Sequence, residues 1–178
     1  NHPLDCPVCD KGGECPLQDN TFKFGPPDTR MEFHRHNNAK ATPLSPVITI
    51  DRERCIACQR CTAYSERIEQ DRGLVMLNRG FHNEVGTFNN QPYDTRFSGN
   101  VIDICPVGAL TNTDFRFKAR TWDLTNADTL CANCGCNCNI TMGTRLNELM
   151  RVEARPNDAV DDGWICDKGR WGHNFLHS

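Results

Sequence analysis

The stretch CIACQRC at residues 55–61 contains Cys55, Cys58 and Cys61, with two residues between each cysteine and the next. Two consecutive gaps of this length let one loop wrap around three corners of a cube. Structural zinc sites instead take separated Cys-x-x-Cys or His pairs as a rule. The spacing therefore favours an iron-sulfur cluster over zinc and leaves one ligand to be found.

The fourth ligand is expected at Cys105, which precedes Pro106. The run Cys-x2-Cys-x2-Cys-x3-Cys-Pro is typical of bacterial ferredoxins, and its fourth cysteine ligates the other of two clusters. Here Ser65 occupies that fourth position. A second run counted back from Cys105 needs cysteines at positions where the sequence has Thr95, Ser98 and Val101. One cluster is therefore lost, and Cys55, Cys58, Cys61 and Cys105 form one complete [4Fe-4S] set.

A second group follows the pattern Cys131-x2-Cys134-x3-Cys138, and Cys166 follows in WICDKG. These four thiols are again a complete ligand set, although a zinc ribbon would use similar pairs. Cys136 lies within the same loop. Spacing does not exclude Cys136 as a ligand in place of Cys134 or Cys138, but we interpret it as a bystander.

The chain opens with a third group, NHPLDCPVCDKGGEC, which contains His2, Cys6, Cys9 and Cys15. Three thiolates and one imidazole also suit zinc. In an iron-sulfur cluster, a neutral imidazole in place of a thiolate removes one negative charge and raises the reduction potential. The sequence therefore predicts three [4Fe-4S] clusters held by twelve residues.

Composition agrees with a chain organised by bound groups. Leu, Ile, Val and Phe make up 36 of 178 residues, which is little for a hydrophobic core, whereas there are 12 cysteines. The cysteines are bunched, as in ligand sets, and we expect no disulfide framework. A net charge of −3 gives no nucleic-acid footprint. We expect no signal peptide and no direct membrane span, since there is no apolar run of 18 residues.

The polar, proline-containing stretch at 21–46 is interpreted as a surface connection. Strands are predicted at 46–51, 74–80 and 119–124, a helix within 59–70 and a β-hairpin within 139–157 with a turn at Asn147-Glu148. The fold class is α+β with low regular secondary structure. We divide the chain into domains at 1–40, 41–118 and 119–178, each carrying one ligand set.

With all three groups in view, the sequence resembles the large iron-sulfur subunit of bacterial respiratory complex I, the NADH:quinone oxidoreductase. The resemblance rests on HPLDCPVCDKGGECPLQD, CIACQRC, RGFHNEVGTF, CPVGAL and CDKGRW. It implies an internal fragment with ferredoxin-like cluster domains, followed by a small β-rich cluster domain of the molybdopterin-oxidoreductase type.

The resemblance also implies a function as an electron relay without a substrate site or catalytic residues of its own. Its expected partners are the flavin-bearing subunit and a two-cluster ferredoxin-like subunit nearer the quinone. The expected location is the cytoplasmic side of the bacterial inner membrane, where partner subunits hold it peripherally.

Two other classes of function stay open at this point. The iron-sulfur segment of an NAD-linked formate dehydrogenase or [FeFe] hydrogenase shares the opening motif, but such proteins usually keep both middle clusters. A zinc-stapled structural module would have no redox role.

Overall fold

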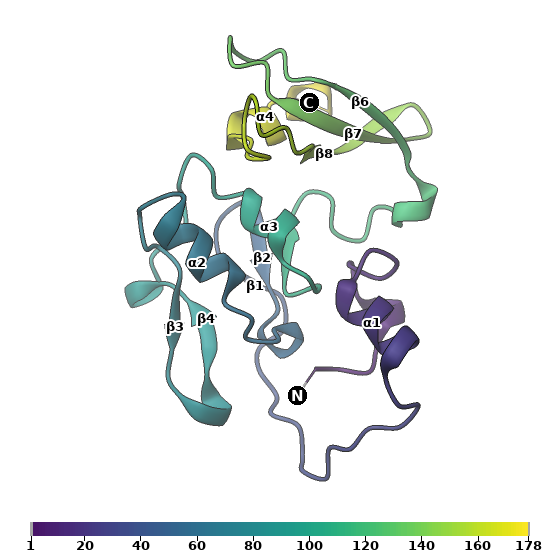
Figure 1. Ribbon diagram of the computed structural model, residues 1–178, viewed down its shortest axis with the longest axis vertical. Coiled ribbons are helices and arrows are strands. Elements are labelled where there is room, and N and C mark those ends of the chain that lie inside the picture. Colours follow the sequence, from purple (N-terminus) through teal and green to yellow (C-terminus); the bar gives the residue numbers. More distant parts are fainter. Residues whose placement is uncertain (1, 178) are drawn as a thin grey trace.

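The computed structural model of the protein describes residues 2–177, which form three small antiparallel sheets and short helices (Figure 1). The α-helices are α1 (Pro16–Phe24), α2 (Arg60–Arg67), α3 (Asn100–Ile104) and α4 (Asp167–Trp171). The strands are β1 (Thr42–Pro43), β2 (Ile48–Ile50), β3 (Val75–Leu77), β4 (Glu84–Gly86), β5 (Leu110–Asn112), β6 (Thr125–Leu130), β7 (Asn139–Arg145) and β8 (Glu148–Ala154). The 3₁₀ turns are η1 (Cys6–Val8), η2 (Arg52–Arg54), η3 (Gly80–His82), η4 (Phe88–Asn90), η5 (Thr121–Asp123) and η6 (Asn174–His177). The predicted α+β class with little regular structure is confirmed.

The central part of the chain is built on the sheet β1-β2-β5 and on the hairpin β3-β4. All three residues of β2 are buried, and Ile48 and Ile50 join Val101, Val107 and Leu110 in the main core. Each such side chain, fully buried, stabilises the fold by about 1.5–3 kcal/mol. Because this core is small, the cysteine-bearing loops lie directly against it.

The sheet β6-β7-β8 forms the last part of the chain and lies with α4 at one end of the molecule (Figure 1). The hairpin β7–β8 confirms the predicted hairpin. Its turn residues Leu146 and Asn147 both have positive φ, at 51° and 66°, as a two-residue hairpin turn with the twist of the strands requires. The turn is thus one residue earlier than predicted.

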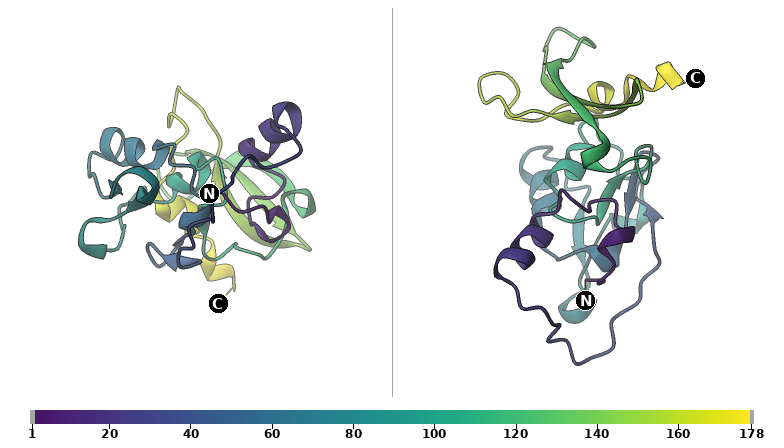
Figure 2. Two further views of the ribbon diagram at one scale, coloured as in Figure 1. Left: turned by 90° about the horizontal axis from the view of Figure 1, so that it is seen from below. Right: turned by 90° about the vertical axis from the view of Figure 1, so that its right-hand side faces the viewer.

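Two predictions for the connecting segments were wrong. The connection predicted to start at residue 21 starts after Gly25, because α1 runs to Phe24 from a start with Cys15 as N-cap and Pro16 as the first helical residue. Proline suits that position since its missing N–H has no partner there. From there residues 26–41 run as a long loop around the outside of the molecule (Figure 2).

The strand predicted at 119–124 is instead the turn η5, and β6 begins only at Thr125. Asp123 closes this turn by accepting a hydrogen bond from the backbone N–H of Arg120 at 3.3 Å. No helix within residues 2–177 has the length and apolar character needed to cross a bilayer.

Candidate metal centres

The middle ligand set comes together in one place. Cys55, Cys58, Cys61 and Cys105 all line one cavity, whose remaining wall is mainly apolar. Cys61 lies in the first turn of α2, and Cys105 is the C-cap of α3. The two helices therefore bring a local triplet and a cysteine more than forty residues away to the same cavity.

Burial governs the acid-base behaviour of these thiols. It raises the pKa of Cys61 to about 12 and also raises the pKa values of Cys55 and Cys105. As free thiols these three residues would hold their protons at neutral pH, whereas a coordinated thiol is deprotonated by the metal. The set of four thiol donors fits a bound cluster of iron and sulfide.

A backbone N–H donates to one sulfur in each of the three sets, at 3.4 Å in every case. The donors are Ala57 to Cys55, Gln18 to Cys15 and Gly169 to Cys166. Amide donors of this kind favour the thiolate and are one of the means by which proteins adjust cluster potentials.

The first set lies in a compact loop. Cys6 begins η1, the backbone N–H of Cys9 bonds to the carbonyl of Cys6 at 3.1 Å, and Cys15 caps α1. The guanidinium of Arg120 bonds from outside the loop to the carbonyl oxygens of Pro7 and Cys9. The loop is thus held from a segment more than a hundred residues later.

His2 is oriented by the backbone directly before the middle set. Its Nδ1 lies 2.8 Å from the carbonyl oxygen of Arg54, and since a carbonyl only accepts, Nδ1 must donate. Nε2 then carries the lone pair that could bind a metal, as in many metal-ligating histidines whose other nitrogen donates to a carbonyl. Burial lowers the pKa of His2, which favours this neutral form.

The third set surrounds the start of α4. The backbone N–H of Cys131 donates to the carbonyl of Cys138 at 2.8 Å, and Cys166 is the N-cap of the helix. A Cβ on Gly169 would lie 3.4 Å from the Cys131 sulfur and 3.8 Å from that of Cys166. Position 169 of the helix therefore lies directly beside both sulfurs, at ordinary van der Waals distance.

Cys136 lies among these ligands and not apart from them. Hydrogen bonds from its backbone N–H and from its thiol lower the pKa of Cys134, and the same thiol contact raises the pKa of Cys136. Both side chains are exposed. The interpretation of Cys136 as a bystander stays a prediction.

The positions predicted to have lost a ferredoxin cluster make contacts within the protein. Ser65 accepts the N–H of Leu74 at 3.2 Å, and Ser98 donates to Asp167 at 2.6 Å. The Thr95 hydroxyl donates to Glu69 at 2.5 Å, and Val101 is fully buried in the core. The four positions at which a second ferredoxin cluster would need cysteines thus take part in hydrogen bonds or in the core.

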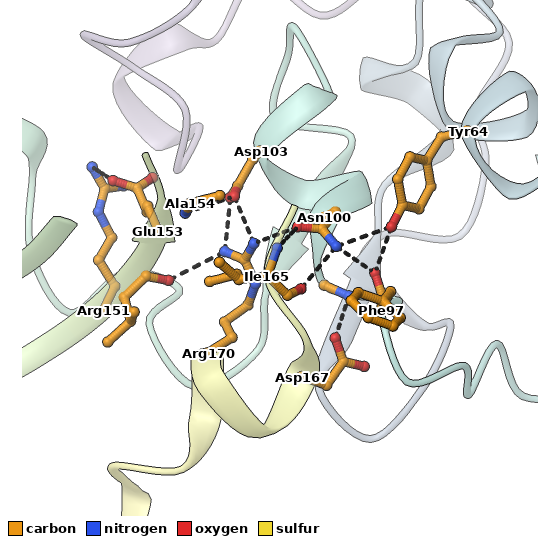
Figure 3. A network of polar contacts seen from close by, with 12 residues as sticks. Tyr64, Phe97, Asn100, Asp103, Arg151, Glu153, Ala154, Ile165, Asp167 and Arg170 are labelled. Atoms are coloured by element: carbon orange, nitrogen blue, oxygen red, sulfur yellow. Dashed lines mark hydrogen bonds and ion pairs between the residues drawn. The ribbon is translucent and has the colours of Figure 1, made fainter. Parts of the chain in front are cut away.

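This region also anchors the third part of the chain (Figure 3). Arg170 of α4 forms a bidentate ion pair with Asp103 of α3, at 2.9 and 2.6 Å. Asn100 donates to the carbonyl of Ile165 at 2.9 Å and accepts its N–H at 3.1 Å. Because Cys105 is the C-cap of α3 and Cys166 is the N-cap of α4, the network joins the middle and third sets.

The first and middle sets also lie against each other. The Cys15 thiol donates to the carbonyl of Pro106 at 3.5 Å, and Pro106 directly follows the ligand position Cys105. Gly108 faces the sulfur of Cys9, and any Cβ there would overlap it. A single peptide segment, 105–108, thus contacts two sulfurs of the first set.

Sequence reasoning predicted the twelve candidate ligands but not the residues that hold them in place. It missed Arg54, Arg120, Asp103 and Arg170, each of which is a charged residue with no recognisable spacing. A weak signal existed for Gly108, which stands within the CPVGAL run. Among residues 2–177, no three His, Cys, Asp or Glu side chains converge on a point suited to a single metal ion.

Three family models match successive parts of the chain. Residues 1–30 match the NADH-ubiquinone oxidoreductase-G iron-sulfur binding region. Residues 45–111 match the ferredoxin-like domain of NADH-quinone oxidoreductase subunit 3, and residues 124–178 match the molybdopterin oxidoreductase Fe4S4 domain.

Similar proteins cover almost the whole chain. NADH-quinone oxidoreductase subunit 3 of Thermus thermophilus is 46% identical over 98% of this chain and 24% of its own length. The NADH-quinone oxidoreductase G subunit of Streptomyces coelicolor is 43% identical over 98% of this chain and 21% of its own length. The chain thus spans about a quarter of these relatives or less.

A solved structure of an NAD⁺-reducing [NiFe]-hydrogenase in the H₂-reduced state has a TM-score of 0.58 and 26% identity with this chain. It covers 66% of this chain, which covers 51% of it.

Proposed function

The chain belongs to the family of NADH-quinone oxidoreductase subunit 3, as its iron-sulfur region, and on this basis we propose that it relays single electrons from the flavin side of the enzyme toward quinone. The observation that carries the proposal is the cavity lined by all four thiols of the middle set. A zinc-stapled module holds each ion at one point, and among residues 2–177 no three His, Cys, Asp or Glu side chains meet at such a point.

Three ligand sets would each hold a [4Fe-4S] cluster in this proposal. The first set is His2, Cys6, Cys9 and Cys15, the middle set is Cys55, Cys58, Cys61 and Cys105, and the third set is Cys131, Cys134, Cys138 and Cys166. Iron-sulfur clusters, when bound, supply reversible one-electron chemistry at potentials that depend on ligands, hydrogen bonds and burial.

In this proposal the residues of the chain hold the clusters, orient the ligands and keep water away from the middle cavity. Backbone amides donate to sulfurs in all three sets, and the carbonyl of Arg54 orients His2. Apolar side chains such as Val85 and Leu110 shield the middle cavity from water. Segment 105–108 keeps the first and middle sets in contact, which suits a relay because electron transfer needs closely spaced centres.

The proposal assigns one domain to each set, at 1–40, 41–118 and 119–178. The partners would be the flavin-bearing subunit and the two-cluster ferredoxin-like subunit of the same enzyme. The chain would be held peripherally by these partners on the cytoplasmic side of the bacterial inner membrane. It would contribute no catalytic residue.

Metal and sulfide analysis of the anaerobically reconstituted chain tests the proposal. Three clusters correspond to about 12 iron and about 12 sulfide per chain. The visible absorbance should be broad and should bleach with dithionite. A colourless protein that binds zinc in all three sets would overturn the proposal. About eight iron per chain would mean that one of the three sets holds no iron-sulfur cluster.

A further inference from the structure

Arg54 stands at the junction of the first two ligand sets. It ends η2 directly before Cys55, and only 5% of the residue is exposed. Its carbonyl oxygen accepts the hydrogen bond from His2. One residue therefore orients a ligand of the first set and precedes a ligand of the middle set.

Three hydrogen bonds to two carboxylates hold the guanidinium of Arg54. It donates to both carboxylate oxygens of Asp5, at 2.6 and 3.0 Å, and to Asp51 at 3.1 Å. Asp5 directly precedes Cys6, so this fork holds the first loop against η2. Planar bidentate pairing of this kind is specific to arginine, because a lysine ammonium cannot reproduce the fork.

The side chain of Arg54 also lies beside a sulfur of the first set. A Cβ on Gly108 would overlap the Cys9 sulfur and would lie 3.6 Å from Cδ of Arg54. The stem of the arginine and the thiol thus pack on the same glycine. A buried positive charge beside a thiolate ligand favours the electron-rich form of the group that the thiolate binds.

We propose that Arg54 is a positioning residue for the first ligand set. It orients the His2 imidazole through its carbonyl and holds the loop of Asp5 through its guanidinium, and its charge raises the reduction potential at this set. The inference rests on the proposed function, since it presupposes a cluster ligated by His2. Other charges face the group: Asp5 and Asp51 directly, and Lys40, whose Nζ lies 3.8 Å from Asp51.

The test is a redox titration of the first cluster by electron paramagnetic resonance in the reconstituted chain. Arg54→Gln removes a positive charge and should shift the midpoint to more negative values. Asp5→Asn removes a negative charge and should shift it in the opposite direction. Arg54→Lys should keep the midpoint near that of the unmodified chain while weakening the hold on the loop.

Arg52→Gln is the matched control. Arg52 belongs to the same turn but pairs with Glu84 at 3.3 Å and with the carbonyl of Val85, on the side of the β3–β4 hairpin. Its replacement should leave the midpoint unchanged. Nitrogen hyperfine coupling in pulsed spectra reports whether His2 stays bound in each variant.

Opposite shifts in Arg54→Gln and Asp5→Asn, with none in Arg52→Gln, would support the inference. An unchanged midpoint and unchanged nitrogen coupling in Arg54→Gln would overturn it, as would an equal shift in Arg52→Gln. If Arg54→Gln does not retain the cluster, Asp5→Asn decides, since an unchanged midpoint there excludes the role of the charge pair. Absence of iron from the unmodified chain would instead refute the proposed function.

Discussion

Gly108 and Cys9 lie so close together that no side chain fits at position 108. A Cβ there would overlap the Cys9 sulfur, although the two residues are about a hundred positions apart in the sequence. Gly108 has no positive φ, so close approach of the two segments, and not backbone conformation, explains the glycine.

Replacing Gly108 with alanine should therefore displace the first ligand set. Overpacking of this kind costs about 1–3 kcal/mol, and reconstituted Gly108→Ala should lose up to one cluster, about four iron per chain. Gly135→Ala is the matched control, because nothing lies within 4 Å of a Cβ at that glycine. Full iron content with unchanged spectra in Gly108→Ala would contradict this account of the contact.

Cys136→Ser should retain three clusters, because the third set has four other thiols and Cys136 only donates to one of them. Cys134→Ser and Cys138→Ser should each lose the signals of the third cluster. Iron content and electron paramagnetic resonance spectra of the three variants provide the measurement. Loss of a cluster in Cys136→Ser alone would show that Cys136 is the ligand.

His2→Cys should keep the first cluster and shift its potential to more negative values, because a thiolate adds a negative charge where the imidazole was neutral. His2→Ala should weaken or open the site. In the assembled enzyme, His2→Ala should impair NADH-to-quinone turnover while flavin reduction stays intact. Unchanged turnover despite proven loss of this cluster would refute the relay.

Arg170→Met should destabilise the contact between α3 and α4. The Arg170 side chain is 2% exposed and that of Asp103 is 22% exposed, and removing one partner from such a pair costs about 3 kcal/mol. Denaturant unfolding measures this loss. Arg72→Met is the control, since Arg72 and Glu66 form a pair with exposed side chains, where the expected loss is about 0.5 kcal/mol. Equal losses in the two variants would argue against a structural role of the network.

Glu69 should make stability fall as pH rises above about 4.5. Burial raises the pKa of Glu69 in the folded chain, although hydrogen bonds from Thr95 and Tyr93 oppose the shift and the charges of Asp71 and Asp167 add to it. The folded state then binds more protons than the unfolded state between the two pKa values, so stability decreases with pH there.

The measurement for Glu69 is the difference in unfolding free energy between the unmodified chain and Glu69→Gln from pH 4 to pH 7. Glutamine does not titrate, so the unfolding free energy of the unmodified chain minus that of the variant should fall with rising pH between the unfolded and folded pKa values of Glu69 and then level off. A difference that grows with pH would mean that the carboxylate is stabilised by the fold, against the expectation from its burial.

The spacing of the cysteines was enough to predict iron-sulfur binding domains and to predict that Cys105 lies with Cys55, Cys58 and Cys61. A two-residue gap constrains a loop locally, whatever surrounds it. The absence of a second complete set is also readable from the sequence, because non-cysteine residues stand where the ferredoxin pattern needs cysteines, at Ser65, Thr95, Ser98 and Val101. The same holds for the hairpin at 139–154, because its alternation is a local property, although its turn lies one residue earlier than predicted.

The arrangement of the ligand sets relative to one another depended on contacts between segments far apart in the sequence. Arg54 with Asp5, Gly108 with Cys9 and Arg170 with Asp103 join residues separated by 49, about 100 and 67 positions. No periodicity marks such pairs, because each depends on which surfaces meet when the chain folds. Local order therefore came from spacing, whereas the orientation of His2 and the joining of the three sets came from burial and long-range packing.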